Sequence, residues 1–289
     1  MKKKMYKIKA KLILYNLLFL SLLSCNPDLD YIVRGYTEKI IVEGKIETGQ
    51  YPIVYLSLNF PLWQAVDSAL VLKNIIGDAK VTVSDGENFE ILTSKWDRTS
   101  FPPHYYKGNR IRGEEGKKYY LTVEKGGYTV SATTTIPRGF NLLDIQSKSI
   151  ERDTLRKIEL TIDAGNDLSK AYRLFTKKSK DIRYVETPIL FNSTLSQKGV
   201  FKMMLSPFPL QTDSSYREGQ YFVKGDSVNI KICAIDSVST MFYRDLAMFS
   251  VKGGNIFVSE VKPLKSNISQ PGFGIWCGAA TKTIRYVVQ

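Results

Sequence analysis

The sequence is poor in histidine, and this restricts the chemistry that one chain can carry out. Among its 289 residues there is one histidine, His104. A metal site built from several histidines is therefore excluded within one subunit, and a Ser-His-Asp triad would have to use His104. The motifs GxSxG and HExxH, the P-loop and the dinucleotide-binding fingerprint are also absent. We expect a protein that is not an enzyme and that has no catalytic residues, no metal and no cofactor.

Cysteine is also scarce, with Cys25, Cys233 and Cys277 in the whole chain. In an oxidising compartment Cys233 and Cys277 can pair, and a loop of that length would contribute roughly 4 kcal/mol in the chain-entropy model. Against pairing, apolar and polar residues alternate over residues 228–233 and place Cys233 on the polar side of its strand. The disulfide therefore stays an open alternative.

Two short polar segments contain residues that occur in known sites. Residues 225–227 read Gly-Asp-Ser, as in the nucleophile block of GDS-type hydrolases, but Ser227 opens an expected strand and no Asp-x-x-His follows. The segment 163–167 offers oxygen ligands for calcium without the spacing of an EF-hand. We interpret both segments as turn and cap chemistry.

The N-terminal segment carries the clearest signal of location. Lysines within residues 2–11 precede an apolar run, residues 12–23, that is too short for a stable membrane span. We interpret residues 1–24 as a secretory signal peptide. Residues 22–24 before Cys25 resemble the lipobox of bacterial lipoproteins, which implies that the Cys25 sulfur takes a diacylglyceryl group and that Cys25 becomes the mature N-terminus. The alternative is an uncleaved anchor with an incidental cysteine.

Charge and sorting signals refine the expected location. Removal of residues 1–24 lowers the net charge from +13 to +7, because this segment holds six lysines and no acidic residue. Basic and acidic residues are interspersed in the rest, which is typical of a solvated surface, so we expect no nucleic-acid partner. Asn26, directly after Cys25, favours the outer membrane by analogy with lipoprotein sorting. The face of that membrane, periplasmic or surface-exposed, is left open.

The pattern of apolar residues predicts a mainly β protein. Residues 25–37 are expected to be a lipidated tether, after which the apolar period becomes two. Residues 38–137 hold roughly six or seven short strands with an Asp-Gly turn at 85–86 and a Gly-Gly turn at 126–127. This spacing predicts an N-terminal immunoglobulin-like antiparallel sandwich.

Residues 138–289 are predicted to form a second β-rich domain. Strand patterns recur through this part, and one helix is predicted near residues 238–250, where apolar residues follow the helical period. Its simplest role is to cover the apolar face of a sheet. The C-terminal residues 284–288 alternate and are expected to tie the end of the chain into this second domain.

Four segments share their strand and turn patterns with one known family. They read VEGKIETGQYPIVYLSL, DAKVTVSDG, GEEGKKYYLTVEKGGYTVSATTTIP and VKPLKSNISQPGFGIWCGA. The chain resembles the domain of unknown function 4249, a family of Bacteroidetes outer-membrane lipoproteins. Because its members commonly accompany TonB-dependent receptors, the resemblance implies an accessory binding role in nutrient uptake, with such a receptor as partner.

Aromatic and basic residues gather in two long connections, residues 61–78 and 96–110. This composition suits stacking on sugars or anchoring a peptide or protein partner, so a surface adhesion or glycan-binding module is the alternative function. The candidate binding residues are Trp63, Trp96, Tyr105, Tyr106 and Arg110. Tyr105 and Tyr106 also fit a second interpretation, in which they fill the core of the sandwich.

Overall fold

The computed structural model describes residues 36–61, 67–150, 155–165, 170–187, 191–192, 199–205, 221–251 and 264–289. The predicted signal peptide, Cys25 and Trp63 lie outside these residues. The chain divides into two compact units, Met1–Glu38 and Lys39–Gln289, and every sheet belongs to the second unit.

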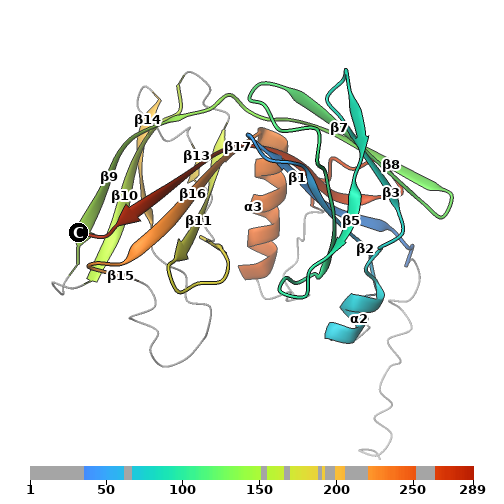
Figure 1. The fold of residues 1–289 in the computed structure, drawn as a ribbon, viewed down its shortest axis with the longest axis horizontal. Helices are drawn as coiled ribbons and strands as arrows, with labels where there is room; N and C mark the ends of the chain where they lie inside the picture. The colour runs from blue at the N-terminus through green and yellow to red at the C-terminus, as the bar shows by residue number, and fades with distance from the viewer. Residues whose placement is uncertain are drawn as a thin grey trace, which may run out of the picture. The chain divides into compact units, whose positions relative to one another are not determined.

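Strands dominate the described part of the second unit, with two short helices, so the prediction of a mainly β protein is confirmed (Figure 1). The first strands are β1 (Ile40–Glu47), β2 (Ile53–Leu58), β3 (Lys80–Ser84), β4 (Phe89–Ile91), β5 (Thr93–Trp96), β6 (His104–Lys107), β7 (Lys118–Lys125), β8 (Tyr128–Thr135) and β9 (Asn141–Ser149). They are followed by β10 (Leu155–Asp163), β11 (Ala171–Lys178), β12 (Val185–Glu186), β13 (Phe191–Asn192), β14 (Val200–Leu205), β15 (Phe222–Val223), β16 (Ser227–Ile235) and β17 (Phe273–Val287). The helices are α2 (Ser68–Lys73), which was not predicted, and α3 (Ser237–Val251), at the predicted place.

Over the described residues, hydrogen bonding arranges these strands into three sheets. The long sheet has the order β12-β11-β16-β17-β1-β2-β6-β5, with β13 also paired to β11. The β3 sheet has the order β4-β3-β7-β8, and its hairpins turn at the predicted positions 85–86 and 126–127. The β10 sheet has the order β14-β10-β15, with β9 also paired to β10.

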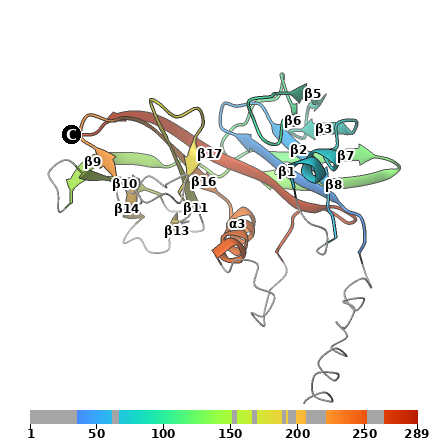
Figure 2. The ribbon, with the colours of Figure 1, turned by 90° about the horizontal axis from the view of Figure 1, so that it is seen from below.

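The alternation of side chains places both smaller sheets on one face of the long sheet. In β17, Trp276 and Ala280 join the large apolar cluster that also contains Leu121 of the β3 sheet and Leu160 of the β10 sheet. The alternate residues of β17 instead join a second cluster with Phe242 of α3. Helix α3 therefore covers the opposite face of the long sheet, as its apolar spacing predicted (Figure 2).

Strand β17 links the two predicted domains through one sheet. It pairs with β16 in antiparallel register and with β1 in parallel register, Ile41 opposite Phe273 and Glu47 opposite Ala279. Within residues 38–137 β1 pairs with β2 in antiparallel register, as expected, but its parallel pairing with β17 was not predicted. The partner of β1 lies more than 200 residues later in the chain, and a local apolar pattern holds no information about such a pairing.

The contact between β1 and β17 depends on two glycines. Gly274 has φ +130°, and a Cβ atom at this position would overlap the carbonyl oxygen of Val42. A Cβ atom on Gly44 would lie 2.6 Å from the ring of Trp276. The absence of both side chains lets the indole fill the space between the layers, where its exposed fraction is 0%.

The side chain of Asn267 connects Trp276, near the start of β17, to the edge strand β8 of the β3 sheet. Its side-chain oxygen accepts from the Trp276 N–H at 2.9 Å, while its side-chain nitrogen donates to the carbonyls of Trp276 at 2.8 Å and Thr133 at 3.2 Å. The neighbouring Ser269 N–H donates to the carbonyl of Ser131 at 2.8 Å. Residues 266–269 thus satisfy backbone groups that an edge strand would leave open.

We expect Asn267→Ala to lower the free energy of unfolding by about 2 kcal/mol or more, because it leaves buried backbone groups of β17 without partners. Urea unfolding followed by tryptophan fluorescence measures this loss. Asn109→Ala is the matched control, since Asn109 is exposed and exposed substitutions change stability by about 0.5 kcal/mol or less. Equal stability of the two variants would contradict the assignment of Asn267.

Candidate ligand-binding face

The outward side of the β3 sheet is a polar surface formed by residues that face away from the core. Along β7, Tyr119, Leu121 and Val123 point inward, so Tyr120 and Thr122 point outward. The register places Tyr120 between Ser84 and Thr133. It places Thr122 between Thr82 and Ser131. Hydroxyl groups from three adjacent strands therefore lie in rows across one face.

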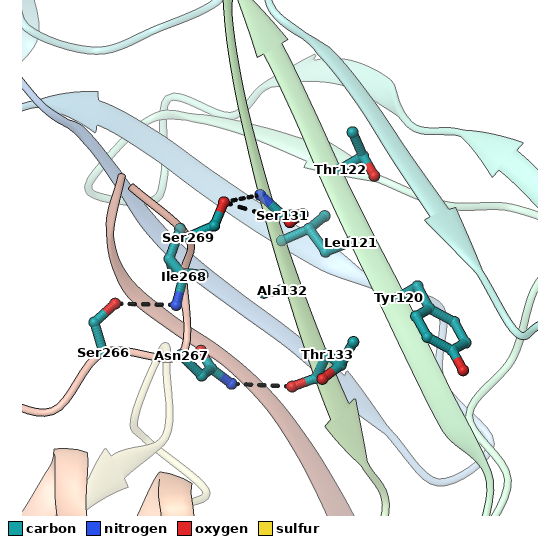
Figure 3. A pocket seen from close by; sticks show the side chains of 10 residues that line it. All are labelled: Tyr120, Leu121, Thr122, Ser131, Ala132, Thr133, Ser266, Asn267, Ile268 and Ser269. Carbon is teal, nitrogen blue, oxygen red and sulfur yellow. Dashed lines mark hydrogen bonds between the residues drawn. The ribbon is translucent and has the colours of Figure 1, made fainter. Parts of the chain in front are cut away.

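An open groove of about 460 Å³ lies where this face meets residues 266–269 (Figure 3). Its lining residues are mostly hydroxyl and amide side chains, and they are Tyr120, Leu121, Thr122, Ser131, Ala132, Thr133, Ser266, Asn267, Ile268 and Ser269. Ser131 Oγ and Ser269 Oγ lie 3.3 Å apart, and the Ser131 N–H donates to Ser269 Oγ at 2.8 Å. These bonds fix the two walls of the groove relative to each other.

Two lysines and one glutamate lie near the groove. Lys80 Nζ and Glu124 Oε1 form an ion pair at 2.8 Å, and Lys118 Nζ lies 5.4 Å from the ring centroid of Tyr120. Tyr120 is 40% exposed, and Phe89, in the same row as Ser84 and Tyr120, is 69% exposed. The face therefore combines hydrogen-bonding groups with exposed aromatic rings and is suited to a neutral, hydroxyl-rich ligand.

The only histidine forms part of a hydrogen-bonded pair rather than a triad. His104 Nε2 lies 2.7 Å from Ser94 Oγ. Burial lowers the pKa of His104, so its ring is neutral at pH 7. Within the described residues His104 Nδ1 has no hydrogen-bond partner, so no carboxylate there orients the ring as a triad requires.

Two of the predicted binding residues lie on opposite faces of the long sheet. Trp96 is exposed at the edge strand β5, where its ring centroid lies 6.1 Å from that of His104. Tyr105 is half-buried on the other face, with its ring 5.8 Å from that of Tyr55. Burial raises the pKa of Tyr55, and the nearby charge of Glu43 adds to this effect. Strand alternation separates Trp96 from Tyr105, so they do not form one surface.

Tyr106 is a core residue. It is 1% exposed, and its hydroxyl donates to the Ile76 carbonyl at 3.1 Å and accepts from the Ala79 N–H at 2.9 Å. The interpretation of Tyr106 as a binding residue is therefore wrong, and the alternative core interpretation holds. Arg110 is exposed in the next loop.

The loop that carries Arg110 is organised by a carboxylate that the sequence analysis missed. Glu90 is buried, and its side chain accepts from the backbone N–H groups of Asn109, Arg110 and Ile111 at 2.9 to 3.1 Å. An acidic residue between two exposed apolar neighbours, Phe89 and Ile91, was the available signal. In a strand this alternation places the carboxylate on the inward side.

Cys233 and Cys277 are both free and buried. Cys233 lies opposite Thr281, four residues from Cys277 along β17, which corresponds to a separation of roughly 13 Å and is too long for a disulfide. The expectation that Cys233 lies on the polar side of its strand is wrong, because α3 covers that side of β16. Burial raises the pKa of the Cys277 thiol to about 12.

Residues considered for catalysis or calcium binding occupy structural positions. Ser227 begins β16 and accepts from Arg285 Nε at 2.9 Å. Asp163 Oδ1 accepts from the Gly165 N–H at 2.8 Å, as expected for a turn, while residues 166–167 lie outside the described part. Among the residues that the structure describes, no group of three or more His, Cys, Asp or Glu side chains could hold a metal ion.

Comparison with known proteins identifies one family. The family described as Domain of unknown function (DUF4249) matches residues 24–285. No curated protein matches the chain.

No helix in the described residues has the length and apolar character needed to cross a membrane.

Similarity to solved structures is distant. A cytokine receptor complex shares 9% identity at a TM-score of 0.24, over 69% of this chain and 86% of that chain. A segment of two fibronectin type-III domains from chicken tenascin shares 10% identity at a TM-score of 0.24, over 85% of this chain and 97% of that chain. The FN1-FN3 domains of chicken CNTN1 share 8% identity at a TM-score of 0.22, over 86% of this chain and 65% of that chain. These scores are too low to define a common fold.

Proposed function

The chain belongs to the DUF4249 family, and from this premise we propose that it is a non-catalytic outer-membrane lipoprotein. In this proposal it is an accessory binding component of a TonB-dependent nutrient-uptake system. Lipid on Cys25 holds it on the membrane, at the periplasmic or the outer face. Signal peptide and lipobox features before Cys25 support the anchor, and the family match begins one residue earlier, at position 24.

The second part of the proposal is that the folded β sheets bind a ligand. We propose that the β3 sheet and the part of the long sheet that it covers act as an immunoglobulin-like sandwich. The observation that carries a binding role is the groove on the outward face of the β3 sheet, with its hydroxyl and amide lining. The Ser94 and His104 pair without an orienting carboxylate in the described residues favours binding over hydrolysis.

A receptor partner is tested by purification of the full-length protein, carrying an affinity tag at its C-terminus, from membranes in mild detergent. We expect one TonB-dependent receptor to be enriched with it, and we expect Cys25→Ser to lose both membrane association and the receptor. The loss follows because the lipid chains contribute about 0.8 kcal/mol per buried methylene group. Membrane-bound, lipidated protein that retains no such receptor would contradict the uptake role.

A glycan-binding module is the second candidate, favoured by the exposed Tyr120 ring beside the hydroxyl-lined groove. We expect Tyr120→Ala to weaken binding of a neutral oligosaccharide, found by array screening, by about fivefold or more, as for other aromatic anchors. Titration calorimetry measures the affinity. Tyr128→Ala is the matched control, because Tyr128 is exposed at the tip of the same hairpin. An affinity that is unchanged in Tyr120→Ala would remove this candidate.

A further inference from the structure

One end of the long sheet brings together segments that are distant in the sequence. Ile40 at the start of β1 lies opposite Leu58 at the end of β2. Strand β6 runs antiparallel to β2, and Trp96 at the end of β5 lies opposite His104 at the start of β6. The β5–β6 turn therefore lies at the same end of the sheet as the start of β1.

Large apolar side chains are exposed at this end. Trp96 is 61% exposed, Phe101 is 56% exposed, and Leu72 of α2 is 43% exposed. Helix α2 reaches this end because the Leu58 N–H donates to the carbonyl of Asn74, the C-cap of α2, at 2.8 Å (Figure 1). We call the surface of Leu72, Trp96 and Phe101 the apolar end.

Local hydrogen bonds order the turn that carries the exposed side chains of Trp96 and Phe101. Asp97 Oδ1 accepts from the N–H and the hydroxyl of Thr99 at 2.8 and 2.7 Å. The Asp97 N–H donates to the Pro103 carbonyl at 2.7 Å and closes the turn. The exposure of Trp96 and Phe101 is thus a property of an ordered turn.

Four basic residues lie in or next to the segments that form the apolar end. They are Lys39, Lys73, Lys95 and Arg98. The acidic residues beside them are Glu38, directly before Lys39, Asp67, whose side chain caps α2 by accepting from the Leu70 N–H, and Asp97. Four basic and three acidic residues leave this end with a net charge of +1.

The chain enters the folded unit at this same end. Lys39 is its first residue, and the Lys39 N–H donates to Asn59 Oδ1 at 2.7 Å, directly after β2. Cys25 precedes Lys39 by 14 positions, and a chain of that length spans at most about 50 Å. A lipid on Cys25 therefore keeps the apolar end within reach of the membrane.

We propose that the apolar end rests against the headgroup layer of the membrane that holds the lipid of Cys25. Tryptophan favours the membrane–water interface, and lysine and arginine are attracted by anionic phospholipids. The short tether gives this end an effective concentration on the order of millimolar at the membrane, so individually weak contacts suffice. The inference rests on the proposed lipid anchor and adds a second, orienting contact.

Tryptophan quenching tests this contact in the full-length lipidated protein. The protein carries Trp63→Phe, so that Trp96 and the buried Trp276 remain, and it is bound to vesicles of phosphatidylethanolamine and phosphatidylglycerol that contain a headgroup-level nitroxide lipid. We expect the lipid to quench emission and the additional change Trp96→Phe to lower this quenching by about threefold or more, since Trp96 is the residue at the interface.

Charge variants provide an independent readout. We expect Arg98→Glu to weaken the quenching of Trp96, and we expect high salt to weaken it in the parent protein. Lys224→Glu is the matched control, because Lys224 is exposed in the turn before β16. This control is expected to leave the quenching unchanged.

Quenching that persists after Trp96→Phe, or that is absent from the parent protein, would overturn the inference. Absent quenching together with loss of the receptor in Trp96→Ala would assign the apolar end to the receptor instead. Mass spectrometry of Cys25 separates this result from failure of the anchor. A protein without lipid contradicts the proposed function, and its quenching on added vesicles still decides the contact of the apolar end.

Discussion

The pairing of β17 with β16 on one side and β1 on the other is the interaction on which the rest of the structure depends. The 15 residues of β17 extend across the region where the two smaller sheets pack. Trp276 is the fourth residue of β17, and its Nε1 donates to the Tyr119 carbonyl at 3.3 Å. Because Gly44 and Gly274 leave room for this arrangement, one strand can contribute to the core shared with each smaller sheet.

This arrangement separates the surfaces that we assign to different tasks. The smaller sheets cover one face of the long sheet and α3 covers part of the other. The outward side of the β3 sheet keeps its hydroxyl groups in solvent, and the apolar end carries the point where the chain enters the fold. In the function that we propose, the apolar end would contact the membrane while the face of the β3 sheet binds a ligand.

Local sequence patterns predicted the elements whose formation depends on neighbouring residues. Alternation and turn residues indicated the β3–β4 and β7–β8 hairpins, and helical spacing indicated α3. Pairings between distant segments were inaccessible, including the parallel β1–β17 pair and the cover that α3 provides for Cys233. For the site, composition named Trp96 and Tyr106 together as candidate binding residues, but Tyr106 is buried through contacts with Ile76 and Ala79 in another connection.

The central claim is that β17 makes both halves of the long sheet one cooperative unit. Hydrogen exchange of backbone amides, followed by mass spectrometry at increasing denaturant, tests it most directly by comparing β2 with β11. We expect both strands to lose protection in a single transition, because each belongs to a sheet held together by β17. Loss of protection in β11 while β2 remains protected would contradict this account.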